Sequence, residues 1–128
     1  MEDYRENIPL TKEEVERIKD IFAIVPFDKL KINEYFHRPH LSDYSVVGRH
    51  GVSIEEVKQL YGKPHLITRG FKREGKKGYN YTMCYYKTES SFIKVIYLFD
   101  NKPVEVLNAM KIDRNLERSV KRKYGIRF

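Results

Sequence analysis

The sequence predicts an α+β domain in which N-terminal helices precede a four-stranded antiparallel β-meander and a C-terminal basic helix. Apolar residues recur with a helical period in the first half and alternate with the period of a strand in the second half. A chain of 128 residues with 41% hydrophobic residues can bury one core, but is too short for two ordinary domains. We therefore expect a single domain over residues 1–128, with an acidic helical extension at 1–41 and a basic core at 42–128.

Two helices in the first half are predicted from capping boxes. Thr11 is followed three residues later by Glu14, and Pro26 ends the apolar stripe that comes after them. Ser53 and Glu56 repeat the same spacing ahead of a second apolar stripe. We expect one helix to begin after each box.

Shorter helical patterns cover residues 28–36 and 42–49. They are separated by Pro39, and Gly51 suits the position just after a helix end. We expect a helix, a tight turn and another helix between residues 42 and 61.

The second half contains four predicted strands, at 65–71, 79–88, 91–100 and 104–111. Short turn-rich segments join them, so we expect neighbours in the chain to pair. Both alternating sets of 91–100 are largely apolar, which is typical of a strand in the middle of a sheet. Residues 72–78 carry four cations and two glycines. This segment is either a phosphate-contacting loop or a solvated hairpin tip.

The chain is expected to end in a basic helix that begins after Asp113 and stops at Gly125. It has one narrow apolar stripe, and Glu117 is its only acidic residue after the cap. The stripe would dock the helix on the sheet, and the remaining faces would hold cations.

Charge is divided unevenly along the sequence. Residues 1–48 hold seven Lys/Arg and ten Asp/Glu, a net of −3, whereas residues 49–128 hold eighteen and eight, a net of +10. Nucleic acid is the commonest large polyanion that a basic domain meets, which makes the second part the candidate working surface. A solvated Lys-rich face kept for solubility explains the same numbers.

Several classes of protein do not fit the sequence. No apolar run approaches the roughly 20 residues that span a bilayer, and the acidic N-terminus lacks the apolar stretch of a signal peptide. We therefore expect a cytoplasmic protein without a membrane partner. The single cysteine, Cys84, cannot form an internal disulfide and is expected in the core. His37 and His40 flank a proline without further ligands nearby, so neither a metal nor another cofactor is predicted.

The candidate functional residues that remain are basic and aromatic, and such residues suit metal-independent RNA cleavage. In that reaction the 2′-hydroxyl attacks its own phosphate, and the enzyme moves protons and stabilises charge. Histidine, tyrosine and arginine can do both, and aromatic rings can stack on bases. Tyrosines at alternating strand positions, including Tyr79, Tyr81 and Tyr85, are more often packing residues.

A family resemblance points to the same chemistry. Residues 49–57 read Arg-His-Gly-Val-Ser-Ile-Glu-Glu-Val, and a Gly-Lys-Pro break and the strands follow. Residues 108–110 read Asn-Ala-Met ahead of a segment with Glu117 and Arg118. Over about residues 44–124 this pattern resembles the BrnT toxins, which belong with the RelE-like ribonuclease toxins. The family usually has Ser-Ala-Arg where this chain has Asn-Ala-Met, so the expected arginine is missing and Lys111 is the nearby cation.

The resemblance implies a RelE-like fold for residues 42–128, cleavage of free or ribosome-bound mRNA, and a toxin-antitoxin system with a partner antitoxin that also binds DNA. His50 carries over from the motif, and Glu117 and Arg118 carry over approximately. The predicted catalytic residues are His50, Arg69, Tyr85, Arg114, Glu117 and Arg118. The predicted RNA-binding residues are Lys72, Arg73, Lys76, Lys77, Lys111, Lys121, Arg122 and Lys123. Two alternatives stay open: a non-catalytic nucleic-acid-binding module, and a partner-binding protein of a small operon or mobile element.

Overall fold

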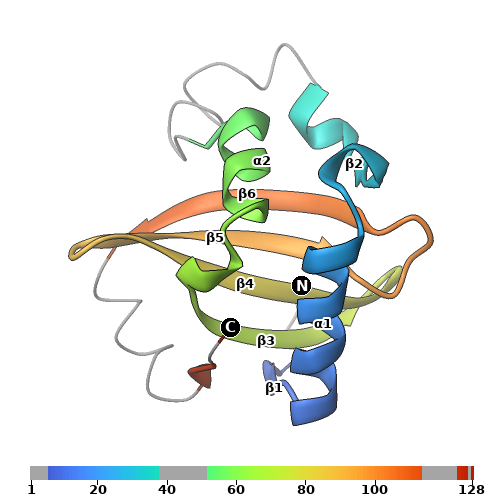
Figure 1. The fold of residues 1–128 in the computed structure, drawn as a ribbon, viewed down its shortest axis with the longest axis horizontal. Coiled ribbons are helices and arrows are strands. Elements are labelled where there is room, and N and C mark those ends of the chain that lie inside the picture. Colours follow the sequence, from blue (N-terminus) through green and yellow to red (C-terminus); the bar gives the residue numbers. More distant parts are fainter. Residues whose placement is uncertain (1–5, 38–51, 114–123, 127) are drawn as a thin grey trace, which may run out of the picture.

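The computed structural model describes residues 6–37, 52–113, 124–126 and 128, and shows two α-helices packed on one face of a β-sheet (Figure 1). The predicted α+β class is confirmed. The elements in chain order are β1 (Ile8–Pro9), α1 (Lys12–Ile24), η1 (Phe27–Lys29), β2 (Lys31–Ile32), η2 (Glu34–His37), α2 (Ile54–Tyr61), η5 (Pro64–Leu66), β3 (Ile67–Gly75), β4 (Gly78–Thr88), β5 (Ser91–Leu98) and β6 (Glu105–Asp113).

The sheet has six strands in the order β1-β3-β4-β5-β6-β2, and it is mixed. The four long strands β3 to β6 pair antiparallel in chain order. The sequence predicts only these four, because β1 and β2 have two residues each and show no periodicity. β1 pairs antiparallel with β3, and β2 pairs parallel with β6.

Both capped helices are confirmed. Thr11 and Glu14 form a complete capping box at the start of α1. At α2 the hydroxyl of Ser53 accepts a hydrogen bond from the backbone N–H of Glu56. The Glu56 carboxylate accepts a hydrogen bond from Lys87 on β4 at 2.6 Å. The second cap therefore also ties α2 to the sheet.

The helix predicted over residues 28–36 is wrong. Two short 3₁₀ turns and β2 occupy this segment. The backbone N–H groups of Lys31 and Asn33 donate to the carbonyls of Val104 and Val106, at 2.8 and 3.0 Å. Pairing with the chain near β6 thus uses N–H groups that a helix would need. The predicted helices at 42–49 and after Asp113, and the turn at Gly51, lie outside the described residues.

The main core lies between the helices and the sheet. Ile18 and Phe22 of α1 and Val57 of α2 pack with buried side chains of β4 and β5. On the opposite face, Phe71, Cys84, Phe92 and Tyr124 form a second cluster. β5 contributes Phe92 to one face and Ile93 to the other, which confirms its interior position.

The end of the chain runs beside the outer edge of β3. Gly125 pairs antiparallel with Arg69, and the N–H of Ile126 donates to the carbonyl of Thr68 at 3.1 Å. Together with β1, this segment occupies backbone groups on that edge that would otherwise invite pairing with another chain. None of the helices in the described ranges combines the length and apolar composition needed to cross a bilayer.

Candidate functional site

The predicted acid–base role of Tyr85 does not fit the structure. Its side chain is completely buried, and its hydroxyl oxygen lies 2.7 Å from that of Tyr97. Burial raises the pKa of Tyr85 well above its ordinary value, and Tyr97 raises it further. A hydroxyl that substrate cannot reach and that keeps its proton belongs to the core.

Arg69 is also misplaced for the predicted contact with a scissile phosphate. Only 1% of the residue is exposed, and its guanidinium carbon lies 5.6 Å from the ring centroid of Phe92. An irregularity in the pairing between Ile67 and Arg69 shifts the register, so Arg69 pairs with Cys84 on the face away from the helices. Arg69 therefore packs with the second cluster.

The structure does not test the remaining catalytic predictions. His50, Arg114, Glu117 and Arg118 lie outside the described residues. The same is true of three predicted RNA-binding cations, Lys121, Arg122 and Lys123. These assignments stay predictions.

Lys72 lies on the predicted basic segment but is engaged by α1. Its ammonium group forms a hydrogen-bonded ion pair with Glu14, and both side chains are largely buried. The ammonium also lies 4.3 Å from the ring centroid of Tyr79. Lys72 therefore anchors α1 to β3 and is not an open phosphate ligand, which corrects its predicted role.

A second polar contact fixes α1 beside the same end of the sheet. Arg17 donates to Asp100 at 2.6 Å and to the hydroxyl of Tyr81 at 3.0 Å, and Tyr81 donates to Asp100 at 2.8 Å. Burial and the hydrogen bond with Asp100 raise the pKa of Tyr81 to about 12, against the opposing effect of Arg17. Both contacts therefore join α1 to the half of the β3–β4 hairpin nearer its turn.

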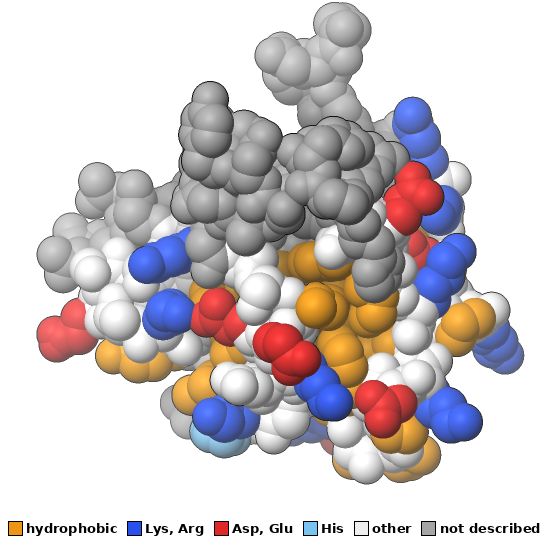
Figure 2. Space-filling model, turned by 90° about the horizontal axis from the view of Figure 1, so that it is seen from above, with side chains coloured by type: hydrophobic (Ala, Val, Ile, Leu, Met, Phe, Trp, Pro, Cys, Tyr) orange, Lys and Arg blue, Asp and Glu red, His pale blue; other side chains and the backbone are white. Residues whose placement is uncertain are grey.

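Arg73, Lys76 and Lys77 come together at the tip of this hairpin. They line a pocket of about 380 Å³, which we call the hairpin pocket. Its lining residues are Asn33, Arg73, Glu74, Gly75, Lys76, Lys77, Asn80, Leu98 and Leu107. Seen from above, Lys and Arg side chains lie along the right-hand side of the molecule, with Asp and Glu side chains among them (Figure 2).

The geometry of the hairpin explains how the cations reach one hollow. Arg73 pairs with Asn80 across the two strands, and Gly75 pairs with Gly78. Lys76 and Lys77 form the two-residue turn. Gly78 has a φ of 113°, which residues with a side chain rarely adopt, so glycine permits this tight turn. The turn brings two lysines next to an arginine and an amide.

The amide of Asn33 and the carboxylate of Glu105 complete the polar surroundings. Asn33 donates to Glu105 at 2.8 Å, and the ammonium of Lys77 lies 3.8 Å from the other Glu105 oxygen. Glu105 is buried, whereas 54% of the Lys77 side chain is exposed. Lys77 can therefore contact Glu105 while part of its side chain stays in solvent.

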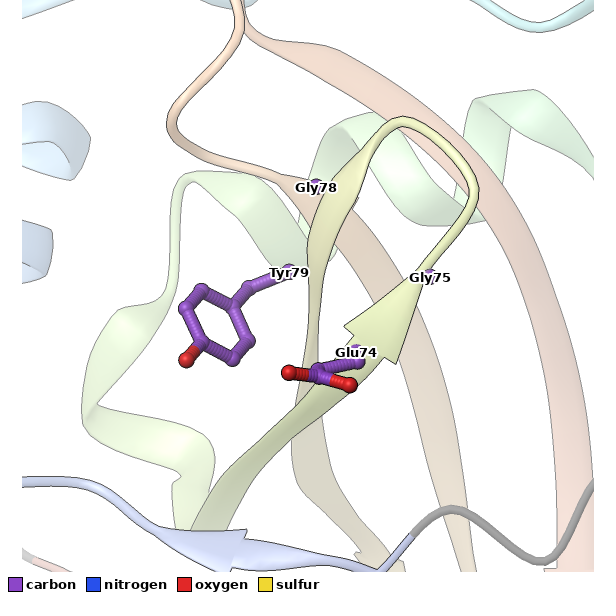
Figure 3. A pocket seen from close by; sticks show the side chains of 4 residues that line it. All are labelled: Glu74, Gly75, Gly78 and Tyr79. Atoms are coloured by element: carbon purple, nitrogen blue, oxygen red, sulfur yellow. The ribbon is translucent and has the colours of Figure 1, made fainter.

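A second pocket, of about 300 Å³, lies against the same hairpin and is called the aromatic pocket. It is lined by Glu74, Gly75, Gly78 and Tyr79. The Tyr79 ring and the Glu74 carboxylate project to the same side of the hairpin (Figure 3), as their pairing across the strands requires. Glu74 and Gly75 line both pockets.

Sequence reasoning missed Asn33, Asn80 and the partly buried Lys94. Lys94 pairs with Cys84 on the same face as Arg73. Burial lowers the pKa of Lys94, Cys84 opposes this effect, and the positive charge of Arg73 adds to it. A lysine between Phe92 and Ile96 in an apolar alternating set is the signal that could have identified it. The asparagines carry no comparable signal.

Lys111, the last predicted RNA-binding cation within the described ranges, is exposed on β6. It pairs with Ile93, which in turn pairs with Tyr85, near the end of the sheet opposite the hairpin tip. Lys111 therefore does not join the hairpin pocket. Across the described part of the chain, no three His, Cys, Asp or Glu side chains are grouped closely enough to hold a metal ion.

Comparisons with known proteins leave the interpretation to this geometry. No protein family, curated protein or solved structure matches the chain significantly.

Proposed function

We propose that the protein binds RNA through the hairpin pocket. The observation that supports this function is the arrangement of Arg73, Lys76 and Lys77 around one hollow, with the side-chain amides of Asn33 and Asn80 beside them. Cations and amide donors are the groups that proteins use to bind phosphate oxygens. Such a site is more specific than scattered surface lysines.

The balance of charge favours an anionic ligand. Three cations line the hairpin pocket, and the carboxylate of Glu74, the one acidic lining residue, projects to the side of Tyr79 (Figure 3). Within the described ranges, neither Arg73 nor Lys76 forms an ion pair. The sequence from residue 49 onwards carries a net charge of +10, which favours a polyanion as the ligand of the protein. Asn33 and Asn80 add side-chain amides to the lining of the same pocket, and the Asn33 amide also donates to Glu105.

RNA cleavage is a further step, and the endoribonuclease toxin implied by the family resemblance stays a prediction. Its remaining candidates, among them His50 and Arg118, lie outside the described residues. Binding without cleavage corresponds to the alternative of a non-catalytic nucleic-acid-binding module.

A binding experiment with matched charge variants tests the proposal. The variant Arg73→Gln/Lys76→Gln/Lys77→Gln removes the three pocket cations. The control Lys12→Gln/Lys29→Gln/Lys63→Gln removes equal charge at exposed positions elsewhere. Fluorescence anisotropy with a labelled mixed-sequence RNA should show about a tenfold or greater loss of affinity for the first variant and little loss for the control.

Two results would overturn this function. Equal losses in both variants would mean that net charge alone determines binding. RNA binding no tighter than the binding of polyglutamate would instead favour an acidic protein partner.

The same mixtures in EDTA, analysed for 2′,3′-cyclic phosphate ends, report on cleavage. Fragments made by the wild type but not by His50→Ala/Arg118→Ala would add ribonuclease activity to binding.

A further inference from the structure

We infer that the RNA is bound as a single strand lying across the β3–β4 hairpin, with its phosphate in the hairpin pocket and a base against Tyr79 in the aromatic pocket. This inference rests on the proposed function, because it assumes that the hairpin pocket binds phosphate. It adds the conformation of the RNA and a residue that recognises it.

The two pockets lie on opposite sides of one thin hairpin. Successive side chains of a strand point to opposite faces of a sheet. Arg73 pairs with Asn80, and the next residue in each strand, Glu74 and Tyr79, forms the neighbouring pair on the other face. The two sides meet at the turn, which has only two residues, Lys76 and Lys77. A strand that passes over this turn can therefore place successive nucleotides on the two sides of the hairpin.

The Tyr79 ring is held in place before any ligand arrives. The Lys72 ammonium lies 4.3 Å from its centroid, and the Tyr81 ring contacts it edge-on at 6.4 Å between centroids. Lys72 is itself fixed by Glu14. The ring is half-buried and lines the aromatic pocket, as Figure 3 shows. A fixed aromatic ring loses little freedom when a base stacks on it.

The charges of the side chains indicate which side of the hairpin contacts phosphate and which side contacts the base. The Glu74 carboxylate projects to the side of Tyr79, where it disfavours phosphate (Figure 3). Arg73 faces the other way, and Lys76 and Lys77 line the hollow on its side. A duplex offers phosphates outside but keeps the faces of its bases stacked inside, so it can occupy only the cationic side. A single strand can occupy both.

Four variants separate this inference from the function on which it rests. Tyr79→Leu removes the aromatic ring, and Tyr79→Phe keeps it. Tyr86→Leu is the matched control, because Tyr86 is an exposed tyrosine on the same strand. The Arg73→Gln/Lys76→Gln/Lys77→Gln variant reports the phosphate contacts. Circular dichroism and thermal unfolding check that each variant is folded.

Each variant is titrated with a single-stranded 12-mer RNA, the matching duplex, and an abasic strand with the same number of phosphates. We expect Tyr79→Leu to weaken single-strand binding about fivefold or more, the low end of one base stack. Duplex and abasic binding should be unchanged, and Tyr79→Phe and Tyr86→Leu should resemble the wild type. The cation variant should weaken all three ligands.

The outcomes distinguish the two claims. If the cation variant weakens binding but Tyr79→Leu affects single-strand and abasic ligands equally, the stacking inference is wrong and the binding site stands. If the cation variant binds all three ligands like the wild type, the proposed function is wrong, and the inference that rests on it is wrong as well. A folded Tyr79→Leu variant with unchanged single-strand affinity also refutes the inference.

Discussion

Lys77 at the tip of the β3–β4 hairpin lies 3.8 Å from Glu105 on β6, so a buried carboxylate competes with any anion for this cation. The contact joins two elements that are distant in sequence. It also connects the hairpin pocket, through Lys77, to β6. A change that removes the charge of Glu105 but keeps its hydrogen bond with Asn33 should alter the affinity for RNA through Lys77.

The first prediction concerns this competition. Glu105→Gln keeps an oxygen to accept the hydrogen bond from Asn33 and removes the negative charge. RNA affinity should rise by about 1.4-fold to fivefold, because a half-exposed ion pair contributes about 0.2–1 kcal/mol. Fluorescence anisotropy at constant salt measures the change. In a Lys77→Gln background the same substitution should have no effect, and an equal rise there would show that Glu105 does not act through Lys77.

The buried tyrosine pair gives a stability prediction. Tyr85→Phe leaves the Tyr97 hydroxyl without its partner from Tyr85, which should lower the free energy of unfolding by about 1–3 kcal/mol. Replacing both tyrosines by phenylalanine should cost less than the two single substitutions added together. Urea titrations measure these differences. RNA affinity should stay constant throughout, and a loss of binding in a stably folded Tyr85→Phe variant would restore a functional role for this residue.

The ion pair of Glu14 with Lys72 predicts a dependence of stability on pH. Burial acts to raise the pKa of Glu14, but the hydrogen bonds from Lys72 and Thr11 and the charge of Lys72 outweigh it and lower the pKa below 4.5. A lowered pKa in the folded state means that the stabilisation is complete above about pH 4.5 and is lost as the pH falls through the folded value.

Unfolding measurements between about pH 3 and pH 7 test this linkage. Glu14→Gln should reduce the wild-type loss of stability at the acid end. Glu13→Gln is the matched control, since Glu13 is exposed on the same turn of α1. Parallel pH profiles for wild type and Glu14→Gln would contradict the proposed ion pair.

Local signals in the sequence predicted the long elements well. Thr11 with Glu14, and Ser53 with Glu56, mark helix starts through contacts three residues apart. The alternation in β4 and β5 reflects a sheet packed on both faces. β1 and β2 could not be predicted, because each exists only through partners far along the chain, such as Phe71 for Pro9 and Val106 for Ile32.

The functional site was harder to predict, because it too depends on contacts between residues that are far apart in the chain. Arg69 is two residues from Phe71 and from Ile67, and only the shift in pairing near residue 68 decides which of these neighbours shares its face. Tyr85 alternates with Tyr81 and Met83, a pattern that favours the core and could have removed it from the catalytic set. Arg73, Lys76 and Lys77 were identified by charge, but Asn33 joins them only through β2 and β6.

The salt dependence of RNA binding is the most direct test of phosphate binding in the hairpin pocket. The logarithm of the association constant falls linearly with the logarithm of salt concentration, by about 0.7 for each phosphate contact on a single strand. Arg73→Gln/Lys76→Gln/Lys77→Gln should therefore reduce the slope by about 2 relative to the wild type. Lys12→Gln/Lys29→Gln/Lys63→Gln should leave it nearly unchanged. Identical slopes for wild type and the hairpin variant would contradict phosphate binding in the hairpin pocket.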